Sequence, residues 1–287
     1  MFVKSTLAAV AVLASLAGTA AAAPAQAEAA KPAPVVVGQP LAQAHAHNDY
    51  EHGRPLFDAL EHGFTSVEAD VWLVDGELLV AHDREDVRPG VTLESLYLDP
   101  LQDLVRSQPG HSVYPHWDGS LQLLIDIKSE GEATYAAIEQ ELAEHRDIMS
   151  RYTNGNVKTG PVTAVISGNR PLATMQAQDK RFSFYDGRSA DLTSGKPADL
   201  MPLVSDNWTR LFTWQGVGPM PAAERARLHA YVAEAHANGY RVRFWATPDV
   251  PGSARDALWN ELFDAGVDHI NTDDLAGLQQ FLNARTA

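Results

Sequence analysis

The feature that most constrains the fold is an alternation of short apolar runs with longer amphipathic stretches, which begins after Pro40. This alternation is typical of βα units that feed a parallel sheet. From it we predict strands over Ala42–His47, Thr65–Leu73, Leu78–His82, Leu121–Ile127, Val162–Ser167, Arg181–Tyr185, Met201–Ser205, Arg241–Ala246 and His269–Asn271. The chain is therefore predicted to adopt an α/β fold.

Helical patterns lie between most of these strands. The clearest is Ala222–Asn238, whose apolar residues recur at three- and four-residue spacing and which ends before Gly239. Thr134–Met149 and Ser253–Ala265 have similar patterns. About eight strands with intervening helices predict a (β/α)8 TIM barrel. An open doubly wound sheet is the alternative, and it is disfavoured because no glycine-rich phosphate-binding sequence follows the first strand.

The first 39 residues predict that the protein is exported and that a flexible tether precedes its folded domain. Residues 1–27 contain an early cation at Lys4, an apolar run over Leu7–Ala20 and small residues at Ala25 and Ala27, which is the layout of a secretory signal peptide. A membrane anchor is the alternative, although the run is short of the roughly 20 residues that span a bilayer. Residues 28–39 predict a flexible tether, and residues 40–287 one barrel domain. We expect a secreted, extracellular protein.

The composition excludes several classes of function. With 22 Lys and Arg against 37 Asp and Glu, the formal charge is −15, which argues against binding to a nucleic-acid backbone. The sequence has no cysteine, so disulfide scaffolds, thiolate zinc sites and a cysteine nucleophile are excluded. We expect no nucleic-acid partner.

Polar residues end several of the predicted strands, where the strands of a barrel converge on one mouth. His45 and His47 share a face of the first strand because side chains alternate, and His47 lies nearer the mouth. Glu68 and Asp70 share a face of the second strand, where their repulsion is costly unless a cation lies between them. This pair predicts a divalent metal site; the alternative is an exposed edge strand with its acids outward.

The next two strands complete the set. His82 closes one run, and Asp126 and Lys128 end the following one, two residues apart on one face. Carboxylates at Glu68, Asp70 and Asp126 suit Mg²⁺ or Ca²⁺, and Lys128 adds a positive charge for a phosphoryl group. Two imidazoles, at His47 and His82, suit the removal and delivery of protons near neutral pH. Phosphodiester cleavage is the chemistry that needs this combination.

The same residues carry a family resemblance. In order along the chain they are a first-strand histidine, an E-x-D strand, a D-G turn followed by H-D, and an acid-x-Lys strand; here they are His47, Glu68 and Asp70, Asp75-Gly76 with His82-Asp83, and Asp126 with Lys128. The sequence resembles the glycerophosphodiester phosphodiesterase and phosphatidylinositol-phospholipase C-like superfamily of TIM barrels. Within it, HNDYEHGRPLFDALEHGFTSVEADVWLVDGELLVAHD is most similar to the fungal "altered inheritance of mitochondria" phosphodiesterase-like proteins and their bacterial relatives.

The resemblance implies roles for individual residues. It implies a catalytic pair (His47 and His82), metal ligands (Glu68, Asp70 and Asp126) and substrate-binding groups (Lys128, Trp245 and Asn48). Two departures argue against assigning a glycerol headgroup. The chain has His47-Asn48-Asp49 where the glycerophosphodiesterases have His-Arg-Gly, and Asp126 where their third ligand is usually Glu.

Further residues at or near the strand ends are candidates for a role in the site. Trp245 can stack on a substrate or belong to the core, and Arg243 can contact phosphate or form a structural ion pair. Asn271, Thr272 and Asp273 end the last predicted strand and can line the mouth, but the favoured role of Thr272 or Asp273 is to cap the helix over Leu275–Leu282. Asp49 is a candidate for orienting a histidine.

The function expected from the sequence is that of a secreted, metal-dependent phosphodiesterase acting on a phospholipid-derived or related organic phosphodiester. Attack by a neighbouring substrate hydroxyl would give a cyclic phosphate, and attack by water a monoester; both remain open. The alternatives are a non-catalytic barrel that binds phosphorylated headgroups or glycans, and a metal-independent lyase that uses an arginine in place of the cation. We expect a monomer with transient contact to a membrane surface.

Overall fold

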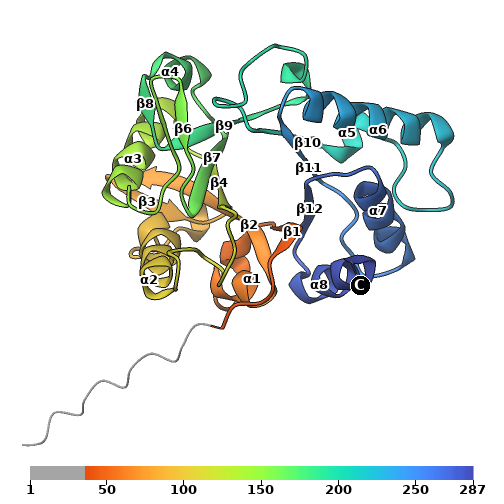
Figure 1. The fold of residues 1–287 in the computed structure, drawn as a ribbon, viewed down its shortest axis with the longest axis horizontal. Helices are drawn as coiled ribbons and strands as arrows, with labels where there is room; N and C mark the ends of the chain where they lie inside the picture. The colour runs from red at the N-terminus through yellow and green to blue at the C-terminus, as the bar shows by residue number, and fades with distance from the viewer. Residues whose placement is uncertain (1–35, 287) are drawn as a thin grey trace, which may run out of the picture. The chain divides into compact units, whose positions relative to one another are not determined.

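The computed structural model describes residues 36–286. Eight parallel strands form a closed barrel, because β1 pairs with both β12 and β2 (Figure 1). This closure confirms the predicted fold class and excludes the open doubly wound sheet. In barrel order the strands are β1 (Leu41–Ala46), β2 (Phe64–Val74), β4 (Leu121–Ile127), β7 (Val162–Gly168), β9 (Ser183–Gly187), β10 (Leu203–Asn207), β11 (Arg241–Trp245) and β12 (His269–Thr272).

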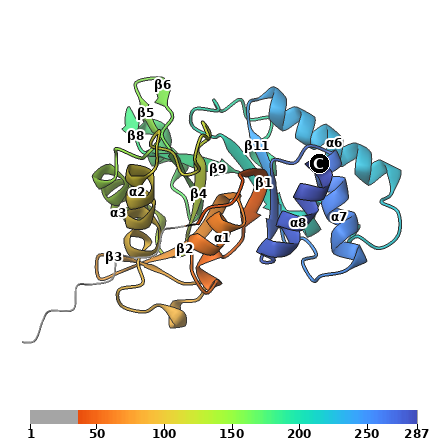
Figure 2. The same cartoon turned by 60° about the horizontal axis from the view of Figure 1, so that its bottom comes forward.

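Helices surround the barrel strands (Figures 1 and 2). None of those within residues 36–286 is long and apolar enough to cross a membrane. Each longer helix buries one stripe against the strands, as α6 does with Leu228, Val232 and Ala235. The helices are α1 (Phe57–Glu61), α2 (Asp99–Ser107), α3 (Gly131–Glu144), α4 (Leu172–Ala177), α5 (Trp208–Leu211), α6 (Ala222–Ala237), α7 (Ser253–Asp264) and α8 (Leu275–Thr286).

The structure departs from the sequence prediction at a hairpin. The segment predicted as a strand over Leu78–His82 is β3 (Glu77–Val80), which pairs antiparallel with β2 outside the barrel. The two-residue turn Asp75-Gly76, with φ of 52° and 92°, returns the chain at once, and a connection this short permits only an antiparallel pairing. The predicted strand Arg181–Tyr185 divides into β8 (Lys180–Arg181) and β9, and β8 joins β5 (Arg151–Thr153) and β6 (Asn156–Lys158) in a second sheet.

The predicted helix Thr134–Met149 is too long at its end. The helix α3 stops at Glu144, because His145 turns its ring onto the carbonyl of Glu141 and the carboxylate of Asp99. Met149 then forms a bridge with Val162 at the start of β7. The predicted signal peptide and most of the predicted tether lie outside the described residues, so both stay predictions.

The inside of the barrel has an apolar half and a polar half. On the consecutive strands β4, β7, β9 and β10, Leu124, Val165, Phe184 and Leu203 form a separate apolar cluster. On the opposite side, β1, β2, β11 and β12 bury His45, Glu68, Arg243 and Asn271 at the same depth. Buried polar groups need partners, so this half must be held together by hydrogen bonds and ion pairs.

Candidate functional site

A cavity of about 250 Å³ opens at the carboxyl ends of the barrel strands. It gathers residues from six of the eight strands or from the loops that follow them. Seven of the eight site residues predicted from the sequence line it, and the eighth, Asp70, contacts two of them. The lining residues are His47, Asn48, Glu68, His82, Asp126, Lys128, Ser167, Arg188, Arg243 and Trp245.

Three carboxylates form the floor of the site. Oxygen atoms of Glu68, Asp70 and Asp126 lie within 4.8 Å of one another. Strand register explains the cluster, since Asp70 on β2 is the direct parallel partner of Asp126 on β4, and Glu68 precedes Asp70 by two residues on the same face. Glu68 is 5% exposed and Asp70 is fully buried, so the alternative of an exposed edge strand is excluded.

Two side-chain cations offset part of this negative charge. Arg243 forms an ion pair with Glu68, as one of its two interpretations predicted, and also donates to Asn271. The Lys128 Nζ atom lies 3.0 Å from Asp70 Oδ2 and 3.5 Å from Asp126 Oδ1. Three carboxylates and two cations leave one negative charge uncompensated.

The ionisation of the acids follows from these contacts. Burial raises the pKa of Asp126 to about 6, and burial together with the charge of Glu68 raises the pKa of Asp70. Burial acts on Glu68 as well, but Arg243 and a hydrogen bond from His45 lower its pKa below the usual value. The ring of His45 is fully buried, and burial with the charge of Arg243 lowers its pKa to about 4. His45 is therefore a neutral donor to Glu68.

The acid cluster fits a hard divalent cation. Asp70 Oδ2 accepts hydrogen bonds from Tyr50 (2.8 Å) and His82 (3.0 Å), whereas Asp70 Oδ1 is buried without a partner. A buried carboxylate oxygen without a donor, in a cluster that keeps a net negative charge, is the environment that Mg²⁺ and Ca²⁺ occupy. Glu68, Asp70 and Asp126 are the residues that could hold such an ion.

Two histidines lie above the acids, and each is oriented by a carboxylate. His47 Nδ1 lies 2.8 Å from Asp273 Oδ1, and His82 Nδ1 lies 3.0 Å from Asp70 Oδ2. With Nδ1–H donated to a carboxylate, the Nε2 atom of each ring is free to take or give a proton. Burial alone would lower the pKa of His47, but the hydrogen bond to Asp273 and the charge of Glu68 raise it overall.

The remaining predicted residues lie at the rim. Asn48 has a left-handed backbone (φ 44°, ψ 45°) and precedes the 3-10 turn Asp49–Glu51, whose Tyr50 donates to Asp70. Trp245, at the end of β11, is partly exposed and lines the cavity, so it is not a core tryptophan. Its ring centroid lies 5.9 Å from the guanidinium of Arg210.

Sequence reasoning missed Arg188. Its guanidinium is fixed beside the cavity by an ion pair with Asp186 and by hydrogen bonds to Ser167 Oγ (3.0 Å) and Ser205 Oγ (3.1 Å). The signal in the sequence is Asp186-Gly187-Arg188, a polar group directly after the predicted strand Arg181–Tyr185. The chain therefore has an arginine at the site although it lacks the His-Arg-Gly sequence.

Two lesser predictions are wrong. Asp49 does not orient a histidine, because its carboxylate accepts from Leu56 N (2.6 Å) and Tyr97 Oη (2.9 Å). Asp273 does not cap α8 but binds His47 at the mouth, which was the alternative for this residue. The cap is Asp274, which accepts from Gly277 N at 2.9 Å, while Thr272 Oγ1 accepts from Asp274 N at 2.9 Å.

Comparison with known proteins shows which family the chain belongs to. Residues 38–186 match the AIM6-like phosphodiesterase domain. "Altered inheritance of mitochondria protein 6" of Eremothecium gossypii is 32% identical over 270 residues, which cover 84% of this chain and 69% of the relative. The chain belongs to the AIM6-like phosphodiesterase family. A homologue of the same protein in Arthroderma benhamiae is 30% identical over 254 residues, or 80% of this chain and 81% of the relative.

The carboxyl-terminal strands of this AIM6-like chain resemble a second family, since residues 241–276 match the glycerophosphoryl diester phosphodiesterase family. Two solved structures from Parabacteroides distasonis share the fold, both at a TM-score of 0.51. A glycerophosphodiester phosphodiesterase is 18% identical and is matched over 87% of this chain and 100% of its own. A glycerophosphoryl diester phosphodiesterase is 11% identical, with 88% of each chain covered. These two structures show that the fold is that of a phosphodiesterase-type TIM barrel.

Proposed function

We propose that this AIM6-like protein is a metal-dependent phosphodiesterase that cleaves a P–O bond by two-histidine acid–base catalysis. The observation that carries the proposal is the pair of carboxylate-oriented histidines, His47 and His82, in one cavity above the three acids. A barrel that only bound phosphorylated headgroups or glycans would have no use for two imidazoles, each with a free Nε2 atom.

The proton transfers follow from this arrangement. An oxygen nucleophile, either water or a neighbouring hydroxyl of the substrate, attacks phosphorus and gives its proton to the Nε2 atom of one histidine. The bond from phosphorus to the leaving oxygen breaks, and that oxygen takes a proton from the Nε2 atom of the other histidine. Water yields a phosphate monoester and an alcohol, whereas a substrate hydroxyl yields a cyclic phosphate and an alcohol.

The charged groups of the site bind the phosphoryl group. Lys128 and Arg188 place an ammonium and a guanidinium on the cavity wall, where they attract the anionic diester and the charge that grows on its oxygens. A divalent cation, when bound by Glu68, Asp70 and Asp126, supplies Lewis-acid polarisation of a non-bridging phosphoryl oxygen. Mg²⁺ and Ca²⁺ are the ions proposed, because the ligands are all carboxylates.

The substrate class proposed is a phospholipid-derived or related organic phosphodiester. Trp245 offers an aromatic face at the rim of the cavity, and Asn48 an amide beside His47. Both groups suit an organic substituent on the phosphate. Export of the protein, a monomeric state and transient contact with a membrane surface remain proposals from the sequence.

The test is turnover of bis-p-nitrophenyl phosphate and of glycerophosphodiesters with Mg²⁺ or Ca²⁺, in the wild type and in His47→Ala and His82→Ala. We expect losses of about 10²–10⁴-fold in kcat for each variant, the range for loss of a general acid or base. His229→Ala, which changes an exposed histidine on α6, is the matched control and should retain full activity.

Two outcomes would overturn the proposal. Unchanged rates in both histidine variants would exclude the two-histidine mechanism. Tight binding of the diesters by the wild type without any turnover, with or without a divalent cation, would favour the binding module. Phosphorus NMR of the products separates a cyclic phosphate from a monoester.

A further inference from the structure

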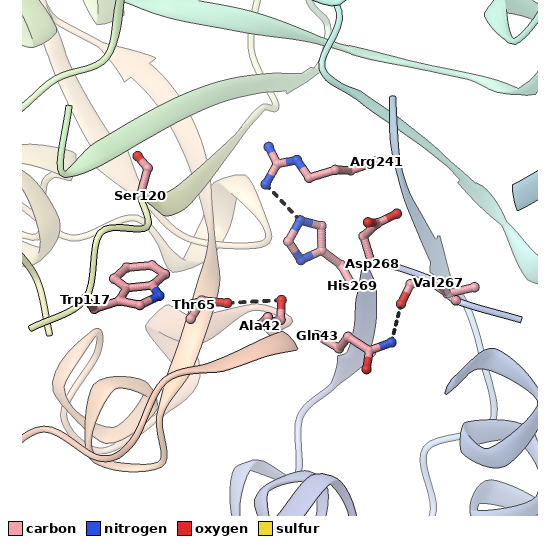
Figure 3. Close-up of a pocket in the computed structure, with 10 residues that line it drawn as sticks. Ala42, Gln43, Thr65, Trp117, Ser120, Arg241, Val267, Asp268 and His269 are labelled. Atoms are coloured by element: carbon pink, nitrogen blue, oxygen red, sulfur yellow. Dashed lines mark hydrogen bonds between the residues drawn. The ribbon is translucent and has the colours of Figure 1, made fainter. Parts of the chain in front are cut away.

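A second cavity lies at the opposite end of the barrel (Figure 3). Its volume is about 430 Å³, and its walls come from the amino-terminal ends of β1, β2, β11 and β12 and from the loop before β4. The lining includes Gln43, Trp117, Arg241, Asp268 and His269. None of these residues takes part in the candidate phosphodiesterase site.

Arg241 brings a positive charge into this cavity without a carboxylate to offset it. The one side-chain hydrogen bond that it makes within the described chain runs from Nη1 to His269 Nε2 at 3.2 Å, and no acid within residues 36–286 lies within 4.0 Å of its guanidinium. Burial lowers the pKa of Arg241, and the charge of Asp268 acts in the opposite direction.

Asp268 is the acid whose charge acts on Arg241, and its Oδ2 atom already has partners. Its Oδ2 atom accepts from Val242 N at 2.8 Å and forms an ion pair of 2.8 Å with His236 Nε2. Arg243 and Arg188, in contrast, each form an ion pair. Arg243 pairs with Glu68, and Arg188 pairs with Asp186. Within the described chain, Arg241 is therefore a guanidinium without an ion pair on the wall of this cavity, where it can receive an anion from outside.

His269 adds a second unsatisfied group. It is 3% exposed, and because Arg241 donates to its Nε2 atom, the ring must be neutral with its proton on Nδ1. Burial and the charges of Arg241 and His45 lower its pKa well below the usual value, in agreement with a neutral ring. The Nδ1 atom is buried without a partner, and a buried N–H without an acceptor costs about 1–3 kcal/mol.

The opposite wall presents one more donor. Trp117 lines the cavity edge-on to Tyr114, with ring centroids 5.3 Å apart, and its indole N–H has no acceptor among residues 36–286. In Figure 3 the indole nitrogen of Trp117 points toward Thr65. Trp117 and Arg241 therefore line one cavity, together with the carboxylate of Asp268, whose Oδ2 atom is bound by Val242 N and His236.

We propose that this cavity binds a small oxyanion, a phosphate or a carboxylate, through the guanidinium of Arg241 and the indole N–H of Trp117. A planar guanidinium recognises both groups through paired N–H donors, and an incoming anion offsets the uncompensated charge. His269 orients Arg241 by accepting its Nη1–H. This cavity shares no residue with the proposed phosphodiesterase site, so the two proposals are independent of each other.

The test follows the indole N–H resonance of Trp117 in two-dimensional ¹H–¹⁵N spectra of the wild-type chain. The resonance is assigned by its loss in Trp117→Phe. Inorganic phosphate and acetate are titrated separately at pH 7 against sodium chloride of equal ionic strength. We expect at least one of the two anions to shift this resonance saturably, and the comparison shows whether the site prefers phosphate or carboxylate.

Variants identify the group that holds the anion. Arg241→Gln should abolish the shift, and Arg241→Lys, which keeps the charge but loses the paired donors, should weaken binding about tenfold. Arg225→Gln, on the surface of α6, and Lys128→Met, in the candidate active site, should leave it unchanged. Absence of a saturable shift in the wild type overturns the proposal. So does a shift that persists in Arg241→Gln or disappears in Lys128→Met.

Discussion

Each proposed catalytic histidine depends on one carboxylate. Asp273 is the only acid in hydrogen-bond contact with His47 among the described residues, and it lies at the end of β12, 226 residues along the chain from the ring that it orients. We predict that Asp273→Asn lowers kcat about 10²–10³-fold with little change in KM, because an amide can favour the wrong tautomer of His47.

The pH dependence separates this positioning role from a structural one. The hydrogen bond to Asp273 helps to raise the pKa of His47, so in Asp273→Asn the corresponding limb of the pH–rate profile should move to lower pH. Asp118→Asn, which changes an exposed acid, is the control. A profile that keeps its shape and position in Asp273→Asn would contradict the role assigned to Asp273.

Asp49 should make the stability of the folded chain depend on pH. Its carboxylate is fully buried, accepts hydrogen bonds from Leu56 and Tyr97 through Oδ2, and leaves Oδ1 without a partner. Burial raises its pKa from 3.8 to about 7. Between pH 3.8 and about pH 7, Asp49 is therefore protonated in the folded chain and ionised in the unfolded chain. Stability from this group is therefore full below about pH 4 and is lost as the pH rises to about 7.

Asp49→Asn removes that dependence, since an amide oxygen can accept both hydrogen bonds and carries no charge. From about pH 5 to pH 8 the wild type should lose free energy of unfolding that the variant keeps. The difference in this loss should be on the order of 2–4 kcal/mol. Urea denaturation of both proteins at these two pH values measures the difference. An equal change with pH in the two proteins would show that Asp49 is ionised in the folded state across this range.

At the scale of one element, the end of β7 determines where Asp126 can lie. Gly168 has φ of +65°, and a Cβ atom there would come within 2.2 Å of Asp126 Oδ1 and 2.3 Å of the carbonyl oxygen of Ile127. We predict that Gly168→Ala lowers the free energy of unfolding by more than about 2 kcal/mol and abolishes phosphodiesterase activity, because strain and overlap act together.

Gly155 provides the matched control for backbone strain alone. It has φ of +82°, and no atom lies within 4 Å of the position that a Cβ atom would take there, so Gly155→Ala should cost about 1 kcal/mol and leave activity intact. Denaturation curves and diester turnover of the two variants make the comparison. Equal losses of stability, with activity kept in both, would contradict the close packing of Gly168 against Asp126.

The element scale also shows how far sequence reasoning reaches. The two-residue periodicity of β2 correctly predicted that Glu68 and Asp70 share a face, because alternation is a local property of a strand. The early end of α3 was not predicted, since it depends on the contact of His145 with Asp99. The antiparallel pairing of β3 was also missed, although its signal, the two-residue turn Asp75-Gly76, is local. Arg188 was missed because the predicted strand stopped before the polar residues that follow it.

The barrel as a whole brings together what the sequence separates. Closure between β1 and β12 places His45 opposite Asn271, and it allows Arg243 of β11 to reach Glu68 of β2 across the interior. No local pattern could predict these contacts, because they depend on closure and stagger of all the strands. The surroundings of Arg241 at the other end of the barrel also depend on closure and stagger of all the strands.

Metal binding should therefore be visible in the stability of the whole molecule. A cation bound by Glu68, Asp70 and Asp126 joins two strands of the folded barrel and has no comparable site in the unfolded chain. At about 100 times its dissociation constant it should add about 2.7 kcal/mol to the free energy of unfolding. Asp70→Asn, which changes the acid with the unpartnered oxygen, should abolish this gain.

A second group of possible ligands makes the test specific. Glu94, Asp99 and His145 also lie close enough together to hold an ion, but Glu94 and Asp99 are exposed on the outside of the barrel. Exposed groups keep their hydration and need no cation, so Glu94→Gln should retain the full metal-dependent gain. Urea denaturation of both variants with Mg²⁺, with Ca²⁺ and with a chelator measures this gain in free energy of unfolding. A gain lost in Glu94→Gln and kept in Asp70→Asn would place the cation on the outer surface and remove the metal from the proposed mechanism.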